Sequence, residues 1–400
     1  MKNFFLFINC FSLLILSGCS SSKNSVSGKK ITSNWIDQNL RSTAQQYKLL
    51  IKNVPEGVMP ETFANGRFIT CQPSNWIAGF YPGNLILLFE ATGDSAFYNE
   101  ALHKITLMDS EQYNTGTHDL GFMMYCSYGN LYKVSPEKKY KEILLNSARS
   151  LSTRFNPKVG CIRSWGNSND TSEFKVIIDN MMNLELLMWA FKETGDSSFY
   201  HIAISHANTT MKNHFRPDNS SYHVVIYDPK TGDVIKKVTA QGAADSSAWA
   251  RGQSWGLYGY TMMYRETKDE KYLEQAQKIA EFISNNPHFP ADEIPYWDYD
   301  APKIPNANRD ASSAAIMASA LIELSNYSNA ALSKKYLNTA SLILHSLSSS
   351  QYRAAYGKEG GFLLKHSVGN MNAHADVDVP LPYADYYYLE ALIRFKNTLQ

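Results

Sequence analysis

The stretch "NMMNLELLMWAFKETGDSSFYHIAISHA" (180–207) decides the fold, because its outline returns at 79–105 and again at 252–283. Each copy has an apolar helix, a tight "TGD" or "TKD" turn, an aromatic residue shortly after the turn, and a second, amphipathic helix. Glycine at the turn can adopt the left-handed conformation that ends a helix, and the aspartate after it can cap the next one. These roles fall to Gly93 with Asp94 and to Gly195 with Asp196.

The same scheme, extended along the chain, predicts twelve helices. Their expected ranges are 33–53, 76–92, 95–109, 119–133, 136–153, 179–194, 196–213, 249–267, 269–285, 310–326, 331–349 and 383–398. The only stretch that reads as strands is 222–239, as a hairpin within a long loop. Repeats of this length indicate an array in which each unit buries its apolar face against its neighbours.

The connections between these helices are unequal. Turns within a pair take a few residues, whereas the loops between pairs are long, for example 214–248 and 350–382. This asymmetry predicts an all-α (α/α)6 barrel with one elaborated face, in which the more apolar first helix of each pair lines the centre. An open tetratricopeptide-like solenoid is the alternative that the pattern leaves open.

Composition bounds the function. The 400 residues are 44% hydrophobic and 19% charged, and a formal net charge of +1 gives no electrostatic basis for binding nucleic acid. Residues 1–18 have the layout of an export signal, with an apolar run after Lys2. The "LSGC" that ends at Cys19 resembles a lipobox. We therefore expect a lipoprotein lipidated at Cys19 on the periplasmic face of a bacterial envelope membrane, a flexible tether at 19–32 and one catalytic domain at 33–400. A soluble secreted protein is the alternative.

Once the signal and the lipidated cysteine are set aside, Cys71, Cys126 and Cys161 remain. Three cysteines make neither a disulfide framework nor a zinc-binding spacing. Cys126 fits a core position, and a bridge between Cys71 and Cys161 is left open.

Polar and aromatic residues that do not suit a core gather where the long loops enter the first helices of the pairs. They are Trp76, His118, Asp119, Asp179, Asn180, Trp249, Arg251, Gln253, Trp255, Arg309, Asp310, Tyr383 and Asp385. Singly, each has an ordinary role: Asp310 and Asp385 suit helix caps, and tryptophans suit a core. Their convergence at one end of the ring predicts a concave ligand site there.

The residue types suggest the chemistry. Two carboxylates, Asp119 and Asp179, suit general acid–base work on a glycosidic or related ether bond, and the apolar surroundings of Asp179 favour its protonated form. Asn180 could steady that acid by a hydrogen bond. Arg251 suits an anionic substrate, and indole faces suit pyranose rings. The stretch "HADVD" (374–378) has metal-ligand types but reads better as a solvated loop, so we expect no metal and no other cofactor.

At these residues the chain resembles the unsaturated glucuronyl hydrolases, glycoside hydrolase family 88, over about 35–398. The resemblance rests on "WIAGFYPG" (76–83), "THDLGFMMYCSYGN" (117–130), "VIIDNMMNLELL" (176–187), "DSSAWARGQSWGLYGYT" (245–261), "PYWDYDAP" (295–302) with "NRDASSAAI" (308–316), and "YADYYYLEALIRF" (383–395). The resemblance implies an (α/α)6 barrel without a metal. It also implies a substrate with a non-reducing 4,5-unsaturated uronic acid, supplied by polysaccharide lyases, whose vinyl ether is protonated at C4 and hydrated at C5.

By motif, the resemblance makes Asp179 the general acid/base and Asp119 the second essential carboxylate. It places His118, Trp76, Trp165, Gln241, Trp249, Arg251 and Trp255 in the sugar subsite, with Arg251 and Gln241 nearest the substrate. We expect glycosaminoglycan disaccharides from chondroitin, hyaluronan or heparin as substrates. Two alternatives stay open: an unsaturated rhamnogalacturonyl hydrolase for pectin fragments, and a non-catalytic, helical-repeat glycan-binding lipoprotein.

Overall fold

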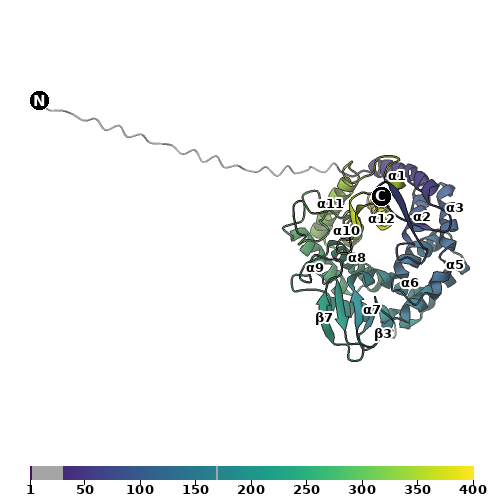
Figure 1. Ribbon diagram of the computed structural model, residues 1–400, viewed down its shortest axis with the longest axis vertical. Helices are drawn as coiled ribbons and strands as arrows, with labels where there is room; N and C mark the ends of the chain where they lie inside the picture. Colours follow the sequence, from purple (N-terminus) through teal and green to yellow (C-terminus); the bar gives the residue numbers. More distant parts are fainter. Residues whose placement is uncertain (2–29, 168–169) are drawn as a thin grey trace.

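Twelve α-helices form a closed double ring in the computed structural model, which describes residues 1, 30–167 and 170–400 (Figure 1). The expected signal peptide, Cys19 and most of the expected tether lie outside the described residues. The inner ring consists of α2 (Phe80–Thr92), η2 with α4 (Gly121–Gly129 and Asn130–Val134), η3 with α6 (Ile178–Asn183 and Leu184–Thr194), α8 (Ala250–Thr267), α10 (Ala311–Ser325) and α12 (Pro382–Asn397). The outer ring consists of α3 (Ser95–Thr106), α5 (Lys138–Ser152), α7 (Ser197–Asn213), α9 (Glu270–Asn285), α11 (Ala330–Leu347) and α1 (Ser33–Asn53).

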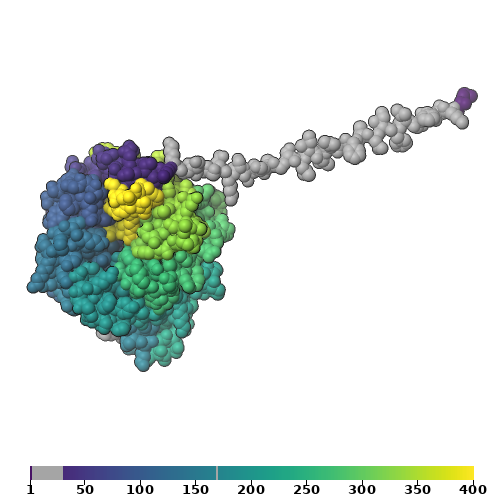
Figure 2. Space-filling view, turned by 180° about the vertical axis from the view of Figure 1, so that it is seen from behind, coloured from purple at the N-terminus to yellow at the C-terminus, as the bar shows by residue number. Residues whose placement is uncertain are grey.

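The ring closes because α12 packs against α2, and each inner helix packs against the next. Viewed from behind, the end of the chain (yellow) lies between the N-terminal helix α1 (purple) and the light-green segment of α11 (Figure 2). This closure confirms the (α/α)6 barrel and excludes the open solenoid. All residues of α10 are buried, as its run of alanine, isoleucine and leucine predicts.

The helix-pair turns follow the predicted chemistry. Gly93 and Gly195 end α2 and α6 with φ of 71° and 73°. Asp94 accepts a hydrogen bond from the backbone N–H of Ala96, and Asp196 accepts one from Ser198, so both cap the following helix. Among the described residues, no helix is long and apolar enough to cross a bilayer.

Strands are more numerous than the sequence suggested. They are β1 (Met59–Ala64), β2 (Arg67–Cys71), β3 (Phe155–Asn156), β4 (Cys161–Ile162), β5 (Phe174–Ile177), β6 (Val224–Tyr227), β7 (Val234–Val238), β8 (Ser367–Asn370) and β9 (Ala375–Val379). The predicted hairpin at 222–239 is confirmed as β6–β7, and β5 extends it to three antiparallel strands. The other pairs, β1–β2, β3–β4 and β8–β9, were not predicted, because these strands are short and scarcely alternate.

Three inner helices begin differently from the prediction, and one of them, α2, starts at Phe80 and not at 76. The expected helix at 119–133 starts as the π-helix η2, and the expected helix at 179–194 starts as the 3₁₀-helix η3. Short 3₁₀ turns are common where α-helices start, and π-helical turns gather at functional sites. Two shorter 3₁₀ segments, η1 (Asp109–Tyr113) and η4 (Glu359–Gly361), lie in loops.

Candidate active site

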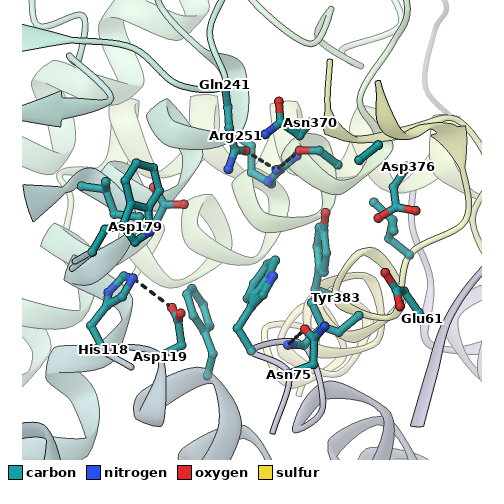
Figure 3. Close-up of a pocket in the computed structure, with 18 residues that line it drawn as sticks. Glu61, Asn75, His118, Asp119, Asp179, Gln241, Arg251, Asn370, Asp376 and Tyr383 are labelled. Carbon is teal, nitrogen blue, oxygen red and sulfur yellow. Dashed lines mark hydrogen bonds and ion pairs between the residues drawn. The ribbon is translucent and has the colours of Figure 1, made fainter. Parts of the chain in front are cut away.

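A cavity of about 240 Å³ lies where the loops and hairpins meet the inner helices (Figure 3). Its wall is formed by Glu61, Asn75, Trp76, Ile77, His118, Asp119, Phe122, Trp165, Ile177, Asp179, Gln241, Arg251, Gly369, Asn370, Ala375, Asp376, Leu381 and Tyr383. The predicted carboxylates Asp119 and Asp179 are both in this wall. The convergence of polar residues at one end of the ring is thereby confirmed.

Asp179 is held in η3 with its side chain 13% exposed. Its Oδ2 is buried without a hydrogen bond of normal geometry, and the Trp255 indole N–H lies near the carboxyl. Burial raises the pKa of Asp179 to about 7; the charge of Asp119 acts in the same direction, whereas the Arg251 guanidinium and the Trp255 indole N–H oppose the rise. The carboxyl is therefore about half protonated at neutral pH, which suits a group that must donate a proton and then recover it.

His223 faces this carboxyl and was missed by the sequence reasoning. Its Nδ1 accepts hydrogen bonds from the backbone N–H groups of Ala240 and Gln241, each at 3.1 Å. Burial lowers the pKa of His223 to about 3, so the ring is neutral and carries its one proton on Nε2. Nε2 lies 3.8 Å from Oδ2 of Asp179. The residue before β6 thus presents an N–H to the acid without contributing a competing charge.

Asp119 sits two residues before η2, with its side chain 16% exposed. Thr117 fixes this turn, since its Oγ1 accepts from the Asp119 backbone N–H at 3.1 Å and donates to Oδ2 at 3.2 Å. His118 places Nε2 3.5 Å from Oδ1 of Asp119. Burial lowers the pKa of His118, which keeps this ring neutral as well. The two carboxylates consequently share a cavity with neutral histidines beside them.

An asparagine pair joins the segments that carry the two acids. Asn183 Oδ1 accepts a hydrogen bond from the backbone N–H of Phe122 at 3.0 Å, which ties η2 to η3. Gly121 permits this approach, because a Cβ there would lie 2.5 Å from Cα of Asn183. Asn180 donates to the carbonyl of Ile162 at 3.0 Å instead of steadying Asp179, so that expectation was wrong. Both asparagines therefore bond to the backbone of neighbouring segments, and neither donates to the Asp179 carboxyl.

Arg251 is fixed on the opposite wall at 3% side-chain exposure. Its guanidinium donates to Gln241 Oε1 at 2.9 Å, to the Gly369 carbonyl at 2.6 Å and to the carbonyl of Val368. It also pairs with Asp310 at 3.2 Å. Arg251 and Gln241, the two residues expected nearest the substrate, therefore act as one hydrogen-bonded unit that lines the cavity.

Two of the four candidate tryptophans line the cavity and two do not. Trp76 and Trp165 line the cavity, as expected. Trp249 and Trp255 do not, because both are buried behind its wall. Trp249 lies under the Arg251 guanidinium at 4.6 Å, and Trp255 packs on Phe122 with ring centroids 5.0 Å apart. Their predicted place in the sugar subsite is corrected to support of residues that reach it.

Of the two aspartates expected to cap helices, one does and one does not. Asp310 caps α10 by accepting from the backbone N–H of Ser312 at 3.0 Å. Asp385 caps nothing: it accepts from the backbone N–H groups of Leu363 and Leu364 and from the hydroxyl of Tyr47. Asp385 lies one turn into α12, where its carboxyl accepts hydrogen bonds from the backbone of a neighbouring loop and not from its own helix.

Several lining residues escaped prediction. Glu61 comes from β1, Asp376 from β9 and Asn370 from β8, all in hairpins that the sequence analysis did not find. Asp376 belongs to the "HADVD" stretch, which was interpreted as a solvated loop. In the described part of the chain, no group of three or more His, Cys, Asp or Glu side chains is arranged to hold a metal ion.

The remaining cysteines are unpaired. Cys71 and Cys161 are buried free thiols, so the bridge that was left open between them is absent. Cys126 is free and half-buried, packed against the core from η2. Burial raises the pKa of Cys71 to about 12, which makes this thiol unreactive at neutral pH.

Comparisons with known proteins agree with this geometry. The family model "Glycosyl Hydrolase Family 88" matches residues 50–396. An unsaturated glucuronyl hydrolase of Formosa agariphila is 47% identical over 81% of each chain, and an unsaturated chondroitin disaccharide hydrolase of Streptococcus pneumoniae is 35% identical over 84% of this chain and 85% of the relative. The crystal structure of an unsaturated glucuronyl hydrolase specific for heparin superposes with a TM-score of 0.88 at 46% identity, covering 92% of this chain and 98% of that one. The protein therefore belongs to glycosyl hydrolase family 88.

Proposed function

We propose that this protein removes the non-reducing-end 4,5-unsaturated uronic acid from glycosaminoglycan oligosaccharides that polysaccharide lyases produce. One observation carries the proposal: Asp179, a carboxyl with a pKa of about 7, shares a single cavity with Asp119 and Arg251. The names of the relatives, which refer to unsaturated glucuronyl units, heparin and chondroitin disaccharide, support the substrate class. A purely glycan-binding role does not explain a half-protonated acid in the site.

The proposed reaction uses the acid twice. Protonated Asp179 gives its proton to C4 of the vinyl ether, which leaves positive charge at C5 stabilised by the ring oxygen. Water adds to C5 and returns a proton to the Asp179 carboxylate, so the acid is restored. The hemiketal that forms at C5 opens, and the bond between C1 and the leaving sugar's oxygen breaks with transfer of a proton to that oxygen. One water is consumed for each bond cleaved.

Arg251 and Gln241 suit the uronate carboxylate. Arg251 is the single lysine or arginine among the residues that line the cavity, and its guanidinium is held rigidly by two backbone carbonyls and by Gln241. A fixed guanidinium binds a carboxylate with little loss of side-chain freedom. Trp76 and Trp165, which also line the cavity, then suit contact with the sugar ring.

Replacement of Asp179 tests the proposal. Asp179→Asn keeps shape and hydrogen-bonding capacity but cannot donate the proton, so we expect cleavage to be lost while disaccharide binding, measured by calorimetry, survives. Cleavage is followed by the loss of ultraviolet absorbance of the unsaturated uronate. Asp94→Asn is the matched control, because asparagine caps an outer helix about as well as aspartate. Full activity of Asp179→Asn would refute the assignment.

A substrate panel separates the proposal from its pectin alternative. Unsaturated disaccharides from chondroitin, heparin and rhamnogalacturonan are compared side by side by kcat/KM. We expect the glycosaminoglycan substrates to be cleaved fastest. A clear preference for the rhamnogalacturonan disaccharide would instead assign the chain to pectin breakdown.

We also propose that the protein is a lipoprotein anchored through Cys19 on the periplasmic face of a bacterial envelope membrane. The support is the order of Lys2, an apolar run, "LSGC" and a serine-rich tether in the sequence. Cys19→Ser should move the protein from the detergent-rich to the aqueous phase on fractionation of the producing cells. Identical partitioning of the two proteins would contradict lipidation.

A further inference from the structure

We infer that Glu61 and Asp376 form the subsite of the leaving sugar and select that sugar by charge, preferring a protonated amine to a neutral group and a neutral group to a sulfate. The inference rests on the proposed function and refines it, because it names which unsaturated disaccharides the cavity accepts best. The reaction assigned to Asp179 does not require either residue.

The two carboxylates occupy the side of the cavity that faces the acids. Glu61 projects from β1 and Asp376 from β9, and both lie across the cavity from Asp119 and Asp179, with Tyr383 between them (Figure 3). A substrate whose C4 lies at Asp179 fills the near side with its uronate ring. The second sugar then extends toward Glu61 and Asp376.

No residue in the described part of the chain donates a hydrogen bond or makes an ion pair to Glu61 or Asp376, in contrast to Asp310 and Asp385. Burial raises the pKa of both groups; the charge of Asp376 adds to the rise at Glu61, and the Arg251 guanidinium opposes the rise at Asp376. Carboxylates that are half-buried, close together and unpaired are stabilised by a ligand that brings hydrogen-bond donors or positive charge.

The charge balance of the cavity also favours a cationic or neutral leaving sugar over an anionic one. Arg251 is the only arginine or lysine among the lining residues, and it already pairs with Asp310 behind the wall. Its terminal nitrogens donate to Asp310, Gln241 and the carbonyls of Val368 and Gly369, so the guanidinium acts on a ligand mainly through its charge. The uronate carboxylate has Arg251 as its counterion. A second anion on the far side would face Glu61 and Asp376, while Arg251, whose charge also reaches Asp376, is already matched by Asp310 and the uronate.

The chemistry of the leaving sugar follows from this arrangement. An ammonium group gains attraction from both carboxylates, and a hydroxyl can donate to either of them. A sulfate can donate nothing and is repelled by both, and such like-charge contacts are a common means of rejecting a wrong ligand. An unsaturated disaccharide that ends in glucosamine with a free amine is the substrate that fits best.

The test compares three disaccharides that differ only at the amine of glucosamine: free, acetylated and sulfated. The full-length protein, Glu61→Gln, Asp376→Asn and the double variant are each assayed for kcat/KM on all three. Asp378→Asn is the matched control, because it lies on the same strand but pairs with His366 and does not line the cavity.

We expect the parent protein to favour the free amine over the sulfated form by at least about tenfold, and the double variant to lose most of that ratio. Asp378→Asn should keep it. Equal rates on the three substrates in the parent, or an unchanged ratio in the double variant, would overturn the inference while the proposed function stands. Failure to cleave any of the three would also overturn the inference, and it would overturn the proposed function only if the unsaturated chondroitin disaccharide is left intact as well.

Discussion

Two buried aspartates, Asp179 and Asp385, have the same raised pKa of about 7, yet they have different roles. Asp385 is held by two backbone N–H groups and the Tyr47 hydroxyl, so its proton has no route to a ligand. Asp179 lines the cavity, with its side chain 13% exposed. A raised pKa alone does not identify an acid catalyst; access to a substrate does.

The pKa of Asp179 predicts the pH dependence of the reaction. Because the acid must hold its proton, kcat/KM should be level below about pH 7 and fall roughly tenfold per unit above it. A series of rates between pH 5 and pH 9, corrected for stability, measures this. A rate that stays level to pH 9 would remove Asp179 from the proton-donating role.

The same shift predicts a stability effect. A carboxyl whose pKa is raised on folding destabilises the native state as pH rises from its unfolded pKa toward its folded one. Asp179→Asn should therefore stabilise the protein by at most about 4 kcal/mol at pH 8, and by clearly less at pH 5. Denaturant unfolding at both pH values checks this. An equal effect at the two values would show that ionisation is not the cause.

Among single residues, the sequence could identify those that lie within a recognisable motif. Asp179 stands out as a charge that follows three apolar residues at the start of an apolar helix, and Asp119 and Arg251 also lie at helix starts. Trp249 and Trp255 could not be placed, because one residue of rotation decides whether an indole faces a cavity or the core. Asp376 could not be placed either, since its position depends on a hairpin that brings β9 to the cavity.

At the scale of elements, the starts of the inner helices set the site. η2 and η3 depart from α-helical geometry where Asp119 and Asp179 emerge, and the contact of Gly121 with Asn183 fixes their separation. A regular helix start in either segment would turn its carboxylate to a different direction.

Gly121→Ala tests this contact. The new Cβ would meet backbone, so η2 and η3 must separate, and we expect a loss of about 1–3 kcal/mol in unfolding free energy with a lower kcat. Gly116→Ala is the control, because it adds the same methyl group in an exposed loop. Unchanged kcat in a folded Gly121→Ala protein would mean that the spacing of the acids is not set here.

The elements that could be predicted are those with repeated turn chemistry. The "TGD" turns locate helix pairs because the glycine ends one helix and the aspartate caps the next. The hairpins carry weaker signals, although Asn65 and Gly66 between β1 and β2, both at positive φ, form a two-residue turn that is typical of hairpins. Attention to that pair would have located β1 and, with it, Glu61.

At the scale of the molecule, ion pairs hold the ring together at the end away from the cavity. Arg265 at the end of α8 pairs with Glu185 of α6 and Glu323 of α10, and Arg394 of α12 joins Glu323. Arg251 and Arg265 are separated by about 21 Å of helix. The candidate active site thus lies at one end of the barrel, and the ion pairs between inner helices lie at the other.

Arg265→Met should separate these two roles. It leaves Glu323, 9% exposed, with one partner fewer, so we expect the unfolding free energy to fall by about 3 kcal/mol. The kcat of the folded protein should be unchanged, because the cavity is remote. Lys138→Met, which removes an exposed pair with Glu142, is the control and should have little effect. A large fall in kcat would show that the two ends are coupled.

Cleavage in heavy water, with mass and NMR analysis of an early-quenched product, tests whether Asp179 protonates C4 of an unsaturated uronic acid. We expect one deuterium, delivered to a single face of C4, and loss of the ultraviolet absorbance in step with release of the leaving sugar. Release of that sugar with the double bond intact, and no face-selective deuterium at C4, would contradict that role of Asp179.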